Sequence, residues 1–116
     1  LEPQQPVTQV IRRGEGTKVV AGQANYEAIL LAACPPGARR DIYLLLTQPG
    51  ADRISQPHPP GSVEHIIVTQ GRAVVGLIDA AEELGPGDYI CYPADQPHIF
   101  KALEPDTHAL LVAEQN

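Results

Sequence analysis

The sequence contains no methionine and no tryptophan, and its single phenylalanine is Phe100. A chain that starts at Leu1 without any methionine lacks its own start, so we expect it to be a piece of a longer protein with a segment upstream. The first six residues include two prolines and two glutamines, which is typical of a linker and unlike the apolar region of a signal peptide. We therefore predict a linker or domain edge over residues 1–6 and a single domain over 7–116.

Cysteine and long apolar stretches are scarce as well. The two cysteines, Cys34 and Cys91, do not form the CxxC pairs of a zinc site, and we expect reduced thiols in place of a disulfide. No apolar run approaches the roughly 20 residues that a membrane-spanning helix needs. These absences favour a cytoplasmic protein without a membrane partner.

Basic residues are outnumbered, with eight Lys and Arg against 14 Asp and Glu and a formal charge of −6. Nucleic-acid-binding domains usually carry a basic patch. The basic clusters here are Arg12-Arg13 and Arg39-Arg40, which we interpret as solvated loop residues. This domain is therefore not expected to contact DNA itself.

Proline and glycine are abundant, with 12 and 10 residues, and they divide the chain into short apolar runs. A length of 116 residues, 43% of them apolar, is enough for one globular domain with one core. Apolar runs of this length between such breaks predict the strands of a sandwich or barrel. The predicted strands are 7–11, 18–21, 26–33, 42–47, 63–69, 73–78, 89–92, 99–103 and 109–113. The one helix candidate, 80–84, is too short to be stable.

Some of these runs are apolar on both faces, as at residues 65–68. A strand with one face in water would alternate apolar and polar residues. Such strands have to be covered on both sides, by a second sheet or by a partner subunit. This pattern predicts a homodimer.

Two segments carry side chains that could form a site. Residues 56–65 include His58 and Glu64, and residues 87–98 end at His98. In a closed barrel these side chains could meet, and two imidazoles with one carboxylate are the ligand set of an octahedral metal with open positions. Histidine and glutamate scattered in this way are also common as structural residues, and the spacing alone does not decide between the two interpretations.

Together the two segments resemble the two sequence motifs of the cupin family, in the right order and register over residues 43–112. Six residues match fixed motif positions: His58, Glu64, Gly71, Gly87, Pro93 and His98. The resemblance implies an all-β fold, the cupin double-stranded β-helix or jelly-roll barrel, with N-terminal strands over 7–48 and the cupin core over 49–113. It also implies that His58, Glu64 and His98 are the candidate ligands of a divalent metal such as Zn, Ni, Mn or Fe.

The sequence departs from the cupin motifs at four positions. Pro60 stands where the motif has its second histidine, and Ala102 stands where it has an asparagine; Asp52 and Asp95 replace glycines. Proline cannot replace a lost imidazole ligand. A three-ligand site should bind metal more weakly, or it holds an organic ligand instead.

Residues 57–65 and 84–98 are similar to one branch of the family, the C-terminal cupin of bacterial helix-turn-helix regulators of the phage-repressor type. This resemblance implies a domain that senses a small-molecule effector and dimerises, with DNA bound only through an N-terminal domain absent from this chain. Proline at the second histidine position is common in that branch. The absence of a starting methionine and the negative net charge agree with this resemblance.

A sensor needs no nucleophile or base, and the sequence offers no convincing catalytic pair, so we predict that this chain is not an enzyme. Two alternatives remain open. One is a small metal-dependent cupin enzyme, a dioxygenase or isomerase, that uses His58, Glu64 and His98. The other is a barrel retained only for dimerisation.

The predicted ligand pocket combines the three candidate metal ligands with three further side chains. The pocket residues are His58, Glu64, Tyr92, His98, Gln56 and Arg53. Tyr92 would lie on the inward face and donate to a ligand, while Gln56 and Arg53 would reach the mouth of the barrel. Arg53 favours an anionic ligand, whereas Glu64 without a metal favours an amine.

Three residues beside the motif positions are expected outside the pocket. His65 follows Glu64 directly and therefore faces the other side of its strand. Cys91 is out of step with Tyr92 and should also lie outside the barrel. Asp88, after a glycine, is expected to be a turn residue.

Overall fold

The computed structural model describes residues 8–19, 25–33, 39–50 and 53–115, and over these residues the chain is built from strands. A single turn of 3-10 helix, Ile78–Ala80, interrupts them. The strands are β1 Thr17–Lys18, β2 Tyr26–Ala32, β3 Arg40–Thr47, β4 Arg53–Ser55, β5 Val63–Gln70, β6 Ala73–Leu77, β7 Glu82–Leu84, β8 Tyr89–Pro93, β9 His98–Ala102 and β10 Thr107–Glu114. The predicted all-β fold class is confirmed. No described helix is long and apolar enough to cross a membrane.

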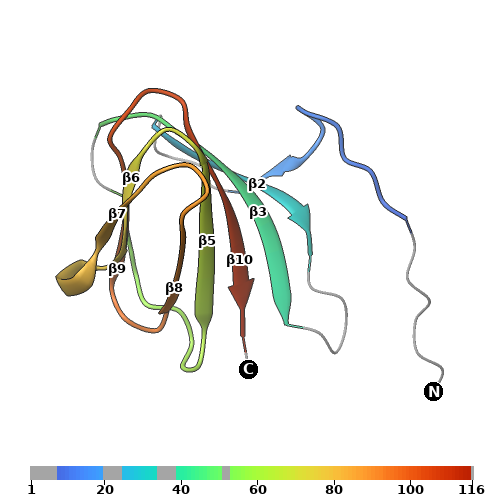
Figure 1. The fold of residues 1–116 in the computed structure, drawn as a ribbon. Helices are drawn as coiled ribbons and strands as arrows, with labels where there is room; N and C mark the ends of the chain where they lie inside the picture. Colours follow the sequence, from blue (N-terminus) through green and yellow to red (C-terminus); the bar gives the residue numbers. More distant parts are fainter. Residues whose placement is uncertain (1–7, 20–24, 34–38, 51–52, 116) are drawn as a thin grey trace, which may run out of the picture.

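Two antiparallel sheets face each other across the barrel (Figure 1). The larger sheet has the strand order β1-β2-β3-β10-β5-β8, and the smaller has the order β4-β9-β6-β7. Strands distant in sequence are therefore neighbours, since β10 lies between β3 and β5, and β9 lies between β4 and β6. This order is a jelly-roll, which brings the segment before β5 and the start of β9 to one end of the barrel.

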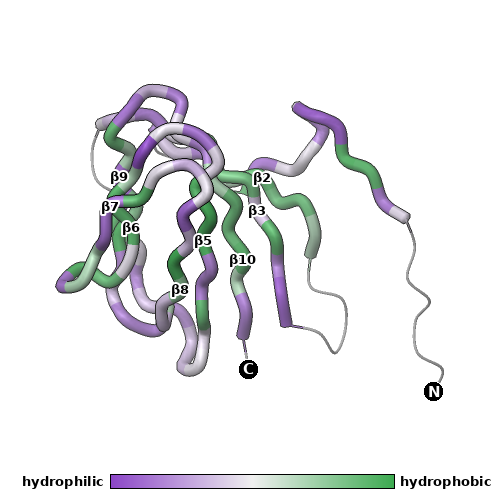
Figure 2. Tube along the Cα trace, in the orientation of Figure 1, coloured by the Kyte–Doolittle hydropathy of each residue, from purple (hydrophilic) through white to green (hydrophobic). Residues whose placement is uncertain are grey.

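The core lies between the two sheets and follows from the period of two in each strand. In β5, Glu64, Ile66 and Val68 are buried, and in β10, Ala109 and Leu111 are buried. Side chains of alternate residues point to the same face, so the buried set lines the inside of the barrel. Figure 2 shows the hydrophobic stretches running along β2, β5 and β10.

The outer face of the larger sheet is not fully covered by the described chain. Ile67, between two buried residues of β5, is 41% exposed. The strand therefore alternates in burial although its sequence is apolar on both faces. The homodimer predicted from this pattern stays a prediction.

At the N-terminal side one strand prediction is wrong, and a second is confirmed only in part within the described residues. Residues 8–11 form no strand, because nothing in the described chain pairs with them, and Val10 is 63% exposed. The strand expected over 18–21 is only Thr17–Lys18 within the described residues. The linker predicted at 1–6 and the thiol of Cys34 lie outside the described residues.

Sequence patterning missed two short strands, β4 and β7. Both lie at the edges of the smaller sheet, where a strand needs one partner and can remain mostly polar. The helix candidate at 80–84 is replaced by the end of the 3-10 turn and by β7. Arg40 likewise is not a loop residue, because it begins β3 and forms an ion pair with Glu114 at 3.3 Å.

Candidate functional site

The site is built around Glu64, a carboxylate inside the barrel. Glu64 is 7% exposed and lies opposite Tyr92 of β8 and Ala113 of β10. It takes an inward position of β5, in step with the core residues Ile66 and Val68. A carboxylate in such a position needs donors or cations near it, because burying an uncompensated charge is costly.

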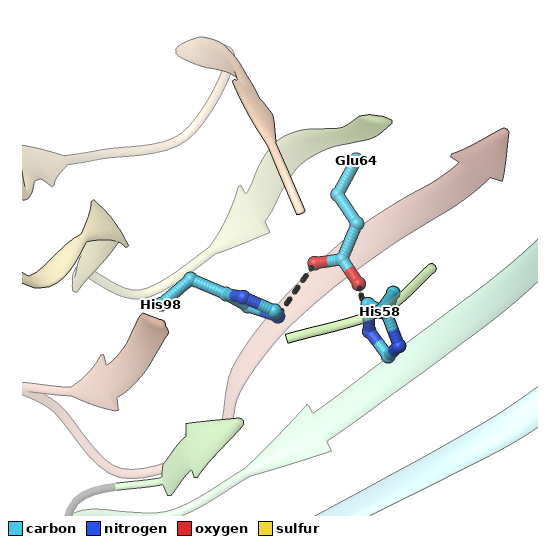
Figure 3. A group of neighbouring side chains, drawn as sticks. All are labelled: His58, Glu64 and His98. Carbon is cyan, nitrogen blue, oxygen red and sulfur yellow. Dashed lines mark hydrogen bonds and ion pairs between the residues drawn. The ribbon is translucent and has the colours of Figure 1, made fainter. Parts of the chain in front are cut away.

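Both predicted histidines reach Glu64, from different parts of the chain (Figure 3). His58 Nε2 lies 3.1 Å from Glu64 Oε2, and His98 Nε2 lies 3.6 Å from Glu64 Oε1. His58 is exposed in the loop before β5, whereas His98 begins β9 and is buried. One potential ligand atom from each of the three residues lies within 4.8 Å of the others. The tertiary structure therefore brings together the three residues that the sequence predicts as metal ligands.

The ring of His98 makes a hydrogen bond through only one of its two nitrogens. Its Nδ1 lies 2.8 Å from the carbonyl oxygen of Gln96. A carbonyl only accepts, so Nδ1 carries the hydrogen, and in the neutral ring Nε2 has a lone pair. This Nε2 is buried and has no hydrogen-bond partner in the structure. Buried polar atoms are rarely left in this state, and the arrangement is that of a metal-binding histidine held by a carbonyl in the outer shell.

Tyr92 also contacts Glu64, through a hydroxyl that donates to Oε1 at 2.5 Å. Burial raises the pKa of Tyr92, and the Glu64 carboxylate raises it further. The phenol therefore stays protonated and keeps its donor role. Because this hydrogen is already used on Glu64, the phenol orients the carboxylate, and its predicted role as a donor to a ligand stays a prediction.

The residues present fit a divalent ion. His58, Glu64 and His98 supply two imidazoles and one carboxylate, a set that leaves coordination positions open. Gln96 and Tyr92 supply the outer hydrogen bonds that orient such ligands. Pro60 contributes no ligand, so these three residues would hold the ion.

A cavity of about 300 Å³ opens beside this cluster, at the end of the barrel where β5 begins and β10 ends. Its volume is at the lower end of the range for small-molecule sites, about 300–1,000 Å³. Of the predicted pocket residues, Arg53, His58 and Glu64 line it. His98 and Tyr92 contact Glu64 but are not among its lining residues.

Two features of the cavity differ from the sequence analysis. Gln56 is exposed and does not line the cavity. Tyr26, Tyr43 and Ser55 do line it and were missed. Tyr26 and Tyr43 come from β2 and β3, outside the motif segments, and no spacing rule in the sequence links them to His58.

The side chains expected outside the barrel lie there. His65 hydrogen-bonds the Tyr89 hydroxyl at 2.7 Å and also contacts Glu114. Cys91 is an exposed free thiol. Asp88 accepts a hydrogen bond from the Gly85 amide at 2.8 Å and so stabilises the turn before β8.

Comparison with known proteins agrees with the barrel and its motifs. Residues 43–113 match the model of the cupin domain, which is more than half of the chain. The chain therefore belongs to the cupin family. No curated protein matches its sequence.

Similar solved structures include regulators and other cupins. An HTH_3 family transcriptional regulator from Vibrio cholerae has a TM-score of 0.75 and 23% identity, over 79% of this chain and 52% of that chain. The cupin domain of an XRE family transcriptional regulator from Enterobacter cloacae has a TM-score of 0.73 and 20% identity, over 79% and 98%. KdgF from Halomonas sp. has a TM-score of 0.74 and 20% identity, over 93% and 95%. The chain thus spans about half the length of the Vibrio cholerae regulator. At these identities the similarity shows the shared fold.

The raised pKa of Tyr26, a cavity residue, predicts how the stability of the protein changes at high pH. Burial raises the pKa of Tyr26 above its ordinary value of 10.0, Glu64 raises it further, and Arg53 lowers it. Above about pH 10 the unfolded chain therefore binds fewer protons at this residue than the folded chain, and the free energy of unfolding should fall as pH rises. At lower pH this residue makes no pH-dependent contribution.

Urea unfolding at about pH 8 and about pH 11 measures this effect. The Tyr26→Phe variant should lose less stability between the two pH values than the wild type. Equal losses in the two proteins would contradict the prediction.

Proposed function

We propose that this chain is the effector-binding and dimerisation domain of a bacterial transcription regulator, and that it has no catalytic activity. The observation that carries the proposal is the cavity of about 300 Å³ with a buried carboxylate beside it. Its size suits a small molecule, and the contacts of Glu64 with Tyr92 and His58 fix the orientation of the carboxylate. DNA would be bound by a separate domain upstream.

The position of the cavity supports a role for its ligand in switching the proposed dimer between two arrangements. Its lining comes from both sheets, with Tyr43 from β3 and Glu64 from β5 in the larger sheet and Arg53 from β4 in the smaller. A ligand that contacts all three side chains would favour one spacing of the sheets. It can act as an effector only if its affinity differs between two arrangements of the dimer.

Charge and similarity support the same proposal. The net charge of −6 disfavours direct contact with DNA, so a separate DNA-binding domain would be required. Two of the similar structures are described as transcriptional regulators, and this chain spans about half of the longer one. In this proposal the DNA-binding domain would lie outside this chain.

A metal-dependent cupin enzyme is the second candidate. The observation that favours it is the buried Nε2 of His98, which has no hydrogen-bond partner and lies 3.6 Å from Glu64. An enzyme of this kind would bind its ion at His58, Glu64 and His98. It would also turn over a substrate, whereas a sensor would only bind one.

Thermal unfolding of the full chain against amino acids, amines and small acids tests the sensor. A ligand that binds the folded state alone stabilises it by about 2.7 kcal/mol at a hundredfold excess over its Kd. We expect a compound of this panel to raise Tm in the wild type and to lose that effect in Glu64→Gln.

The matched control for Glu64→Gln is Glu82→Gln, which removes an exposed carboxylate from β7. It should respond like the wild type. No stabilising compound, or equal stabilisation of Glu64→Gln, would refute the proposal. Chemical conversion of the bound compound by the metal-loaded chain would favour the enzyme instead.

A further inference from the structure

Arg53 is the one arginine among the residues that line the cavity, and the register of β4 places it inside the barrel. Arg53 lies opposite Phe100 of β9, and Ser55 lies opposite His98. Opposed residues of antiparallel strands project to the same face, and both β9 partners are buried. Ile54, between the two, is 50% exposed on the outer face. The guanidinium therefore enters the barrel from the edge strand of the smaller sheet.

This guanidinium has no acidic partner among the described residues. Its Nε is buried without a hydrogen-bond partner, and the guanidinium lies over the ring of Tyr26, whose centroid is 5.3 Å from Cζ. Lys18, Arg40 and Arg72, in contrast, each form an ion pair with a glutamate on the surface. A donor buried without an acceptor costs free energy, which an incoming acceptor would recover.

We propose that the effector is a small carboxylic acid whose carboxylate binds Arg53. This inference rests on the proposed function, because it names the chemical class of the compound that the cavity would sense. A guanidinium is planar and offers parallel N–H donors, which match the two oxygens of a carboxylate. The Tyr26 ring contacts the cation through its face, so the donor edge remains for an acceptor from the cavity.

The charges around the cavity favour a carboxylate over a phosphate. Asp41, Glu64 and Glu114 also line it, so a dianion would meet repulsion from several carboxylates. A monoanion meets less repulsion and still pairs with Arg53. The rest of the molecule would then extend toward Glu64 and His58, which line the same cavity.

The side-chain Nε–H signal of Arg53 in the ¹⁵N-labelled 116-residue chain reports on this site directly. The probes are the monoanions butyrate and benzoate, each compared with its uncharged amide, butyramide and benzamide. We expect at least one of the acids to shift the Arg53 signal and to raise Tm, and both amides to do neither at the same concentration. Arg53→Gln should weaken binding of that acid at least about tenfold, the minimum for a lost charge-assisted pair.

Arg13→Gln is the matched control, since it removes an exposed arginine outside the cavity, and it should bind the acid like the wild type. Acids that bind Arg53→Gln as tightly as the wild type would overturn the inference. Amines or neutral compounds that stabilise the chain through Glu64 but not through Arg53 would overturn it while leaving the sensor intact. If no compound of either panel binds, both the inference and the proposed function fail.

Discussion

Replacing His98 with alanine is expected to weaken Ni²⁺ binding by at least about 100-fold, since even outer-shell changes cost 10–100-fold. The imidazole is buried, its Nδ1 is held by the Gln96 carbonyl, and its Nε2 has no other hydrogen-bond partner. The substitution removes one of three ligands, and Pro60 supplies no replacement, because it stands where the motif has its second histidine. Isothermal titration with Ni²⁺, which binds nitrogen and oxygen ligands more tightly than Mn²⁺ or Fe²⁺, measures the loss.

His65→Ala is the matched control for this experiment. His65 follows Glu64 directly but lies on the outer face, where it contacts Tyr89 and Glu114. Its removal deletes an imidazole that is adjacent to Glu64 in sequence but points away from the site, and it should leave the Ni²⁺ affinity unchanged. If His65→Ala weakened binding as much as His98→Ala, or if the wild type bound no ion, the assignment of the three ligands would be wrong.

The second large effect is expected at Gly71, the motif glycine between β5 and β6. Gly71 has a φ of +77°, and a Cβ there would lie 2.9 Å from the Cα of Thr107 and 2.3 Å from its Oγ1. Thr107 is fully buried and donates a hydrogen bond to the Glu104 carbonyl at 2.8 Å, so it cannot move aside easily. Left-handed strain of about 1–2 kcal/mol adds to overpacking of about 1–3 kcal/mol. Gly71→Ala should therefore lower the free energy of unfolding by about 2–5 kcal/mol.

Gly87→Ala separates the two contributions. Gly87 also has a positive φ, +88°, but a Cβ at this position meets nothing within 4 Å. This variant should lose only the strain contribution of about 1–2 kcal/mol. Urea unfolding of both variants gives the comparison. Equal losses would show that the approach of Thr107 to Gly71 has no energetic cost.

The interior strands of the larger sheet could be predicted from sequence, because inward and outward residues alternate along each strand. Val63–Gln70 and Thr107–Glu114 are central strands whose inward residues form the core, so their apolar runs mark them clearly. The motif spacing placed His58 and His98 beside Glu64, since one end of a closed jelly-roll collects all three. The same patterning failed at the edge strands β4 and β7, which need little apolar surface and leave only a weak sequence signal.

The sequence by itself determined the all-β class and the three candidate metal ligands. These follow from alternation within a strand and from spacing within a motif. Only the tertiary structure decided that Arg53 points inward over Tyr26, that Gln56 stays outside the cavity and that Nε2 of His98 has no hydrogen-bond partner. These features depend on which strands become neighbours and in which register, and that is decided by pairing between segments far apart in the chain.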